Sequence, residues 1–298
     1  MGASLQASRI AMPADSGGCE TVLEFLIQRF SRIDPAIWQQ RVAEGKVHWE
    51  DGTVITEQTP YVPHKKVCYY REVENESVVP FQEEIIYQDE NILVACKPHF
   101  LPVSPVGKYV RQTLVSRLIE RTGIETLAPL HRIDRETAGL VMLAVNPETR
   151  NHYHRLFRED GLIRKTYRAV AHIGDENRPE AGQNWKVENR MVQGDPWIRM
   201  TVVPGEINAR SEMRCLEVYD KSALFELSPL TGKTHQLRVH MSGLGYPLVN
   251  DLFYPELQPE GSDDYDRPLQ LLAHRLEFTD PVTGELRSFT STRDLLKI

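Results

Sequence analysis

The sequence predicts an α+β protein in which a mixed, mainly antiparallel sheet follows a small N-terminal α/β domain. After about residue 85, segments with strand character outnumber helical ones and do not alternate regularly with helices. Residues 20–72 show a helix–helix–hairpin pattern instead. An acidic stretch without Lys or Arg, residues 73–84, lies between the two and is expected to be a linker.

The N-terminal domain is predicted from apolar spacing and turn residues. Residues 1–19 hold no apolar stretch long enough for a signal peptide, and we expect them to form a flexible tail. Apolar residues between positions 22 and 30 share one helix face. A second helix is expected to begin with Asp34 as N-cap and Pro35 in the first turn. A hairpin turning at Asp51-Gly52 follows.

The second domain, residues 85–298, is predicted to be built mostly from strands. Hairpin strands are expected through 185–230, and a helix capped by Thr234 should end at Gly243 or Gly245. The other expected elements are a helix over 112–121, a buried strand over 140–146, a helix over 148–160 and a strand over 162–173.

Composition excludes several classes of protein. The 298 residues are 41% hydrophobic and 26% charged, which is typical of a globular protein and not of a disordered, collagen-like or coiled-coil chain. No apolar run approaches the ~20 residues needed to cross a bilayer, so we expect no membrane association. Four cysteines lack metal-ligand or redox spacing, which indicates reduced thiols and a cytoplasmic protein.

The net charge of −7 by itself argues against a nucleic-acid partner. The acidity, however, is concentrated in residues 72–90 and 256–266, which contain no Lys or Arg. Between residues 131 and 168 there are eight Lys or Arg against five Asp or Glu. The argument against a nucleic-acid partner is therefore weakened but not removed.

Three segments place polar residues beside buried strands. In the first, Asp134 precedes an apolar strand and is flanked by arginines, which fits either a site or a surface ion pair. In the second, Lys165 and Tyr167 share one strand face, where the Tyr could equally be packing. The third, TGKTHQLR, begins a helix whose first turn and Arg238 suit an anion. It is not a phosphate loop, because the required first glycine is replaced by Leu227.

These segments together resemble the RluA/RsuA-type pseudouridine synthases. HRIDRETAGL (131–140) is similar to the family's catalytic signature, and PLTGKTHQLRVH (229–240) to its later arginine motif. RKTYRAVAHIG (164–174) resembles the strand between them, and ILVACKPHFLPV, GYPLVNDLFYP and LLAHRLEFTDPVTGE are weaker matches. Residues 24–55 resemble a divergent α-L RNA-binding domain, although Glu50-Asp51 adds negative charge where RNA would approach.

The resemblance implies a central catalytic cleft and the isomerisation of uridine to pseudouridine in rRNA or tRNA, without a cofactor. It makes Asp134 the catalytic carboxylate, Tyr167 the residue that stacks on the target base, and Arg238 the partner of Asp134. It further implies RNA contacts by a set of basic residues. We also expect the protein to be a monomer. The expected RNA-binding residues are Arg132, Arg135, Lys165, Lys233 and His235.

Two other functions stay open at this point. One is a non-catalytic RNA-binding protein on the same fold. The other is a hydrolase in which Asp134 works with His131 or His235 to orient water. No His/Cys cluster has metal-ligand spacing, so no metal is expected.

Overall fold

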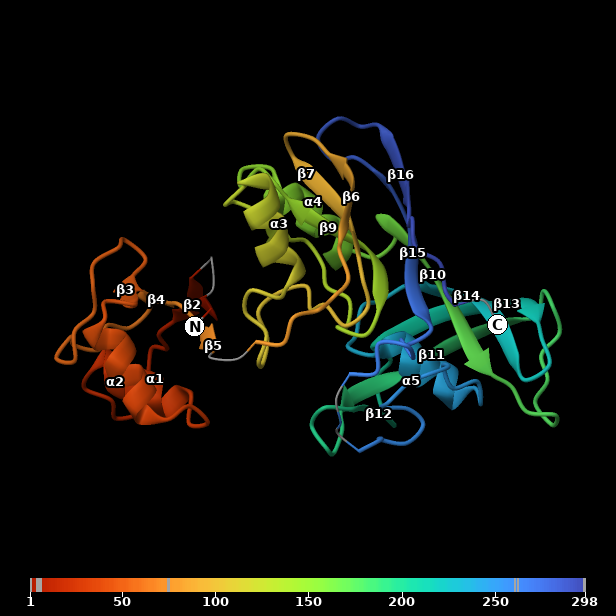
Figure 1. Cartoon of the computed structure of the whole chain (residues 1–298), viewed down its shortest axis with the longest axis horizontal. Helices are drawn as coiled ribbons and strands as arrows, with labels where there is room; N and C mark the ends of the chain where they lie inside the picture. The colour runs from red at the N-terminus through yellow and green to blue at the C-terminus, as the bar shows by residue number, and fades with distance from the viewer. Residues whose placement is uncertain (1, 4–6, 74–75, 260, 262, 297–298) are drawn as a thin grey trace. The chain divides into compact units, whose positions relative to one another are not determined.

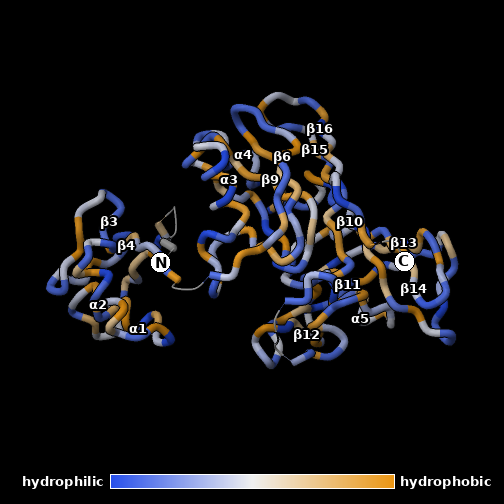
Figure 2. Tube along the Cα trace, viewed as in Figure 1, coloured by the Kyte–Doolittle hydropathy of each residue, from blue (hydrophilic) through white to orange (hydrophobic). Residues whose placement is uncertain are grey.

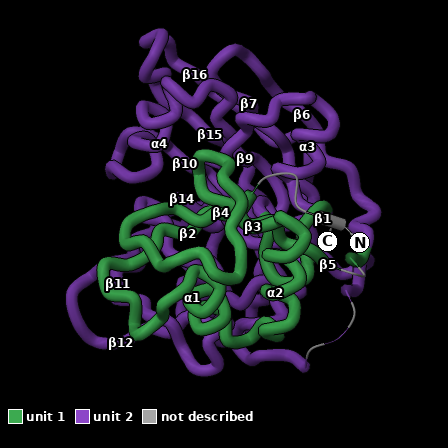
Figure 3. Tube along the Cα trace, turned by 90° about the vertical axis from the view of Figure 1, so that its left-hand side faces the viewer, with its two compact units in different colours: residues 1–77, 105–111 green, residues 78–104, 112–298 purple. Residues whose placement is uncertain are grey.

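A computed structural model describes the chain except residues 1, 4–6, 74–75, 260, 262 and 297–298. The chain divides into two compact units, which Figure 3 colours separately. Unit 1 contains residues 1–77 and 105–111, and unit 2 contains residues 78–104 and 112–298. The boundary falls within the expected linker, but segment 105–111 joins unit 1 because the Glu76 carboxylate accepts the backbone N–H groups of Val110 and Arg111.

Unit 1 is formed by two short helices and two small sheets. Helix α1 begins with a capping box, in which Thr21 and Glu24 satisfy each other's backbone N–H groups. Asp34 caps helix α2 and Pro35 occupies its first turn, as predicted. The elements are α1 (Val22–Arg29), α2 (Pro35–Ala43), β1 (Gly2–Ala3), β2 (Ser8–Ala11), β3 (Val47–Trp49), β4 (Lys66–Tyr69) and β5 (Glu72–Val73).

The expected N-terminal tail is largely part of this unit. Strand β2 pairs antiparallel with β4, and β1 pairs with β5. Met12 is buried in the same core as Trp38, so the chain is anchored well before residue 20. Residues 1 and 4–6 of the predicted tail lie outside the described part of the chain. The prediction of a flexible tail overlooked that residues 8–12 supply an edge strand and a core side chain.

Unit 2 contains a large, almost wholly antiparallel sheet and three helices in its described residues. Its helices are α3 (Leu114–Thr122), α4 (Arg150–Arg158) and α5 (Gln236–Gly243). Its strands are β6 (Glu84–Gln88), β7 (Ile92–Lys97), β8 (Ala128–Pro129), β9 (Ala138–Ala144), β10 (Ile163–His172), β11 (Asn184–Gln193), β12 (Met200–Val203), β13 (Ala209–Val218), β14 (Ser222–Pro229), β15 (Leu271–Thr279) and β16 (Leu286–Thr290). The predicted α+β class is therefore confirmed.

The strand order β12-β11-β13-β14-β10-β15-β9-β7-β6 brings together segments that are far apart in sequence (Figure 1). Strand β16 pairs with β15, and β8 pairs with β9. Among the described strands, every pairing is antiparallel except that between β15 and β9, where Leu272 lies opposite Ala138 and Ala273 opposite Gly139. The segment that leads into β9 is therefore brought beside the C-terminal part of the chain.

Among the hydrophobic clusters in the described residues of unit 2, two are large. One joins β7, β9 and α4 through residues such as Met142 and Tyr153. The other joins β10, β13, β14 and α5 through residues such as Phe225 and Met241. Figure 2 shows apolar stretches along inner strands such as β9 and β10. Within the described residues, no helix is both long and apolar enough to span a bilayer.

Helix α5 begins later than the sequence predicts. Its N-cap is His235, which has a left-handed backbone (φ 53°) and no capping bond from its side chain, so the prediction of Thr234 as cap is wrong. The Gln236 side chain ties down the preceding turn instead, because its Oε1 accepts the Thr231 hydroxyl and the Lys233 backbone N–H. This turn fixes where the helix, and with it Arg238, begins.

Gly139 lies where β9 meets β15. Its φ is +110°, and a Cβ at this position would lie 2.2 Å from the backbone oxygen of Ala273. Both the backbone conformation and the close approach of the two strands require glycine here.

We expect Gly139→Ala to reduce the free energy of unfolding by at least about 3 kcal/mol, because the obstructing atom is backbone and cannot move aside. Urea unfolding followed by circular dichroism measures the change. Gly284→Ala is the matched control: its φ is also positive, but a Cβ there meets no atom within 4 Å, so only about 1 kcal/mol of strain is expected. Equal losses in the two variants would contradict the packing argument.

Candidate active site

Asp134 lies in the segment between β8 and β9, and its side chain is 24% exposed. Lys97, the last residue of β7, and His99 shortly after it hold the backbone of the residues that follow Asp134. The Lys97 ammonium donates to the backbone oxygens of Arg135, Pro98 and Leu101, at 3.1, 3.0 and 2.7 Å. The backbone next to Asp134 is therefore held by hydrogen bonds, while the Asp134 carboxylate itself stays accessible to solvent.

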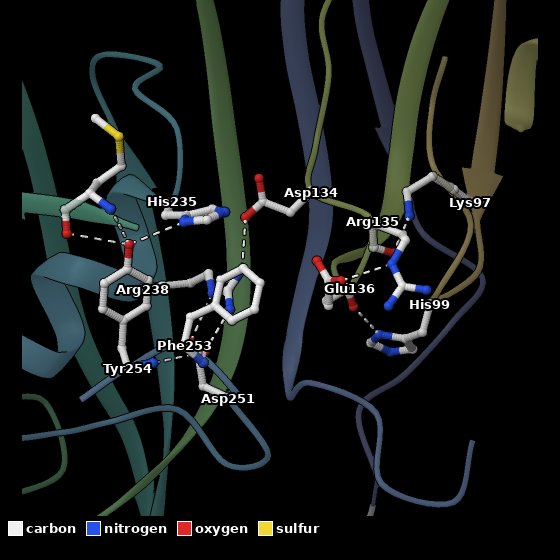
Figure 4. A network of polar contacts seen from close by, with 11 residues as sticks. Lys97, His99, Asp134, Arg135, Glu136, His235, Arg238, Asp251, Phe253 and Tyr254 are labelled. Atoms are coloured by element: carbon white, nitrogen blue, oxygen red, sulfur yellow. Dashed lines mark hydrogen bonds and ion pairs between the residues drawn. The ribbon is translucent and has the colours of Figure 1, made fainter. Parts of the chain in front are cut away.

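Burial lowers the pKa of Lys97 to about 7, although nearby carboxylates, among them Asp134, favour the charged form. His99 donates from Nδ1 to the Glu136 backbone oxygen at 2.6 Å. Figure 4 shows Lys97 and His99 on one side of this segment and the Asp134 carboxylate directed toward the other.

Arg238 projects from helix α5 toward Asp134. One of its terminal nitrogens, Nη1, lies 3.5 Å from Asp134 Oδ2. Its other two nitrogens donate hydrogen bonds to Asp251, from Nε to Oδ2 at 2.8 Å and from Nη2 to Oδ1 at 2.6 Å. The side chain of Arg238 is 1% exposed and that of Asp251 0%. A single buried guanidinium thus links two carboxylates, one buried and one partly open to solvent (Figure 4).

The surroundings keep Arg238 charged. Burial opposes the charge, but the hydrogen bonds and charge of Asp251, with a smaller contribution from Asp134, outweigh it and raise the pKa of Arg238. The guanidinium carbon also lies 4.7 Å from the ring centre of Phe253 and 5.5 Å from that of Tyr254. Asp251 is itself held by the backbone N–H groups of Phe253 and Tyr254.

Tyr167 comes from β10, at a register shift where the strand meets β15. Its ring packs against the cluster shared by β10, β14 and α5. Burial, and then the charge of Asp134, raise the pKa of the Tyr167 phenol, so the hydroxyl is neutral at physiological pH. The three residues for which the sequence predicts chemistry, Asp134, Tyr167 and Arg238, therefore share one region of unit 2.

The residues expected to bind RNA lie in different surroundings. Lys165 and Lys233 line a cavity of about 230 Å³, together with Thr231 and the last turn of α4. Arg132 is exposed. The guanidinium of Arg135 is already bound by Asp263, at 2.9 and 2.7 Å, and by Glu136.

Asp263 belongs to the acidic segment 256–266, so one carboxylate of that segment is paired with a predicted RNA-binding residue. His235 shares a 3.1 Å hydrogen bond with the Tyr254 hydroxyl, in the wall beside Arg238.

Sequence reasoning missed three residues that support this site. Asp251 lies within GYPLVNDLFYP, and Lys97 and His99 lie within ILVACKPHFLPV, which are the weaker motif matches. A lysine that ends a wholly buried strand was a signal for Lys97, since an ammonium in such a place needs fixed acceptors. No comparable signal marked Asp251, because its partner lies on another element.

The partly buried histidines near the site are neutral. Burial lowers the pKa of His131 to about 3, and its Nε2 accepts the backbone N–H of Met142 at 3.1 Å. Burial also lowers the pKa of His235. Among the described residues, no three His, Cys, Asp or Glu side chains are grouped closely enough to hold a metal ion.

Comparison with known proteins identifies the class of enzyme. The family model described as RNA pseudouridylate synthase matches residues 91–243, about half of the chain, which include Asp134, Tyr167 and Arg238. The chain belongs to this family. It is an RNA pseudouridine synthase of the RluA type, and hence an isomerase.

Individual relatives agree with this assignment. The synthase is 32% identical to an uncharacterized RNA pseudouridine synthase of Synechocystis sp. over 78% of this chain and 79% of the relative. It is 28% identical to ribosomal large subunit pseudouridine synthase D of Neisseria meningitidis serogroup B over 92% of this chain and 75% of that protein. The structure of human RNA pseudouridylate synthase domain containing 1 matches with a TM-score of 0.55 and 26% identity, over 72% of this chain and 84% of that one.

His240 makes the stability of the synthase sensitive to acid. Its ring, on α5 next to Arg238, is buried and shares hydrogen bonds with Ser211 and Asn189. Burial lowers its pKa from 6.5 to about 4, so the unfolded chain binds the proton more readily. The contribution of His240 to the free energy of unfolding is therefore fully present above pH 6.5 and is lost as the pH falls toward 4.

We therefore expect His240→Gln to reduce the slope of unfolding free energy against pH in this window, by at most about 1.4 kcal/mol per pH unit. Urea unfolding at a series of pH values measures the slope. His152→Gln, at an exposed position of α4, is the control and should leave the slope unchanged. An identical slope in wild type and His240→Gln would contradict the expectation.

Proposed function

We propose that this synthase isomerises particular uridines in rRNA or tRNA and that Asp134 is its catalytic carboxylate. The observation that supports this most is the partly exposed Asp134 carboxylate, held 3.5 Å from the buried guanidinium of Arg238. The fixed guanidinium holds this accessible carboxylate in one position, where it can act as a nucleophile or as a base.

The reaction conserves atoms and needs no oxidant or reductant. The bond between uracil N1 and ribose C1′ breaks, the base turns, and a bond forms between C5 and C1′. The hydrogen at C5 leaves as a proton, and N1 ends with one. In this proposal Asp134 acts as the nucleophile at C1′ or as the base toward the ribose, and Arg238 holds its carboxylate in position.

In this proposal, the other site residues bind the RNA substrate. Tyr167, with its neutral ring beside Asp134, would stack on the target base. Lys165 and Lys233 supply positive charge to the cavity that they line, which suits an RNA phosphate. Arg132, which is exposed, would enter the RNA helix in place of the extruded uridine. Arg135 could bind RNA only after leaving Asp263.

The proposal names the class of RNA that is modified and not the individual uridine. Ribosomal RNA is favoured by the name of the Neisseria relative, whose match covers 92% of this chain and so includes most of unit 1.

The monomeric state and the cytoplasmic location stay predictions from the sequence. A hydrolase that uses His131 is disfavoured, since burial lowers the pKa of that ring to about 3, which makes it a weak base, and its Nε2 already accepts a backbone N–H.

Asp134→Asn should abolish pseudouridine formation while leaving RNA binding intact, because the amide preserves shape and removes the nucleophilic charge. The measurement is release of tritium from RNA labelled at uridine C5, with total tRNA and total rRNA as separate substrates. Asp175→Asn, the same change at an exposed position, is the control and should retain wild-type release. Tritium release by Asp134→Asn at the wild-type rate would refute the role of Asp134.

A further inference from the structure

Trp197 is a large apolar side chain that the structure leaves on the surface. It is 65% exposed and lies in the loop that joins β11 to β12. Of the other tryptophans, Trp38 and Trp49 are buried in the core of unit 1, and Trp185 packs against the core of unit 2. Of the four tryptophans, Trp197 is the one whose side chain is mostly exposed to solvent.

The loop is fixed to the wall of the proposed active site. The backbone N–H of Met200 donates to the Tyr254 hydroxyl at 2.7 Å. Arg199 lies 5.0 Å from the centre of the same ring and donates from Nη2 to the Pro255 backbone oxygen at 2.6 Å. The end of the loop nearest Trp197 is therefore tied to the segment that follows Asp251.

Tyr254 connects this loop to the catalytic groups. Its ring centre lies 5.5 Å from the Arg238 guanidinium carbon, and its hydroxyl shares a hydrogen bond with His235. Trp197 precedes Met200 by three residues, which span at most about 10 Å of chain. Trp197 therefore lies within about 10 Å of chain from the residue that hydrogen-bonds Tyr254, a span of about three bases at roughly 3.4 Å for each stacked base.

We propose that Trp197 stacks on an unpaired base of the substrate RNA that flanks the target uridine. This inference rests on the proposed function of the neighbouring site. A base offers a flat apolar face that matches an indole, and such stacking tolerates any sequence. The hairpin 184–203 carries three basic residues against two acidic ones, and Arg190 is exposed on its strand β11. A phosphate backbone is therefore compatible with this surface.

The ring should respond directly to a base. We would titrate the synthase with oligoadenylate, which contains no uridine and cannot be a substrate, and record tryptophan fluorescence. Trp197→Phe, measured in parallel, isolates the signal of Trp197. We expect wild-type fluorescence to be quenched, and the quenching to be largely absent in Trp197→Phe. Heparin, a polyanion without bases, should not quench; equal quenching by heparin would overturn the proposal.

The affinity should depend on the aromatic ring. Trp197→Ala should weaken oligoadenylate binding about tenfold, while Trp197→Phe retains most of the affinity. Val202→Ala is the matched control, since Val202 is 48% exposed on the same hairpin and lacks a π face. Equal Kd values for Trp197→Ala and Val202→Ala would overturn the proposal. Circular dichroism of each variant shows that the fold is intact.

Steady-state kinetics distinguish the proposed role of Trp197 from the proposed function of the active site. With RNA that the wild-type synthase modifies, Trp197→Ala should raise KM and leave kcat at the wild-type value, because the ring positions RNA and touches no reacting atom. A lower kcat with unchanged KM would overturn the positioning role. If no RNA were modified by wild type, the proposed function would fail, while the oligoadenylate result would still decide the role of Trp197.

Discussion

The architecture of the site depends on one guanidinium that is shared by two carboxylates. Arg238 is buried, and a buried charge is stable only when it is paired and hydrogen-bonded. Asp251 meets that requirement with two hydrogen bonds, which leaves Nη1 for Asp134. Arg238 is therefore held in place before any RNA binds. Asp134 can remain accessible because its partner is anchored elsewhere.

The fold brings these groups together across long distances in sequence. Asp134 precedes β9 and Arg238 lies on α5, and they are 104 residues apart. The parallel contact between β9 and β15 makes this possible, because it places the segment before β9 next to β15 and its neighbour β10. A close approach of backbones at Gly139 is the condition for that contact. The position of the segment that carries Asp134 thus depends on the close packing at Gly139.

The sequence was sufficient to predict the α+β class, the helices of unit 1 and the grouping of Asp134, Tyr167 and Arg238, because local periodicity and two long motifs carry that information. It did not predict that β2 completes a sheet, since edge strands of four residues have little pattern of their own. Thr234 was a plausible cap, but the bonds made by Gln236 decide where α5 begins. Asp251 could not be predicted because its role arises only from contacts between distant elements.

Single-turnover pseudouridine formation by Arg238→Lys is the most direct test of the central claim. Lysine keeps the positive charge but presents one compact donor group, which cannot grip Asp251 through two nitrogens and also face Asp134. The account predicts a rate about 10- to 100-fold below wild type with RNA affinity unchanged, as expected when charged hydrogen bonds are lost. A wild-type rate in Arg238→Lys would contradict it, because charge alone would then be sufficient.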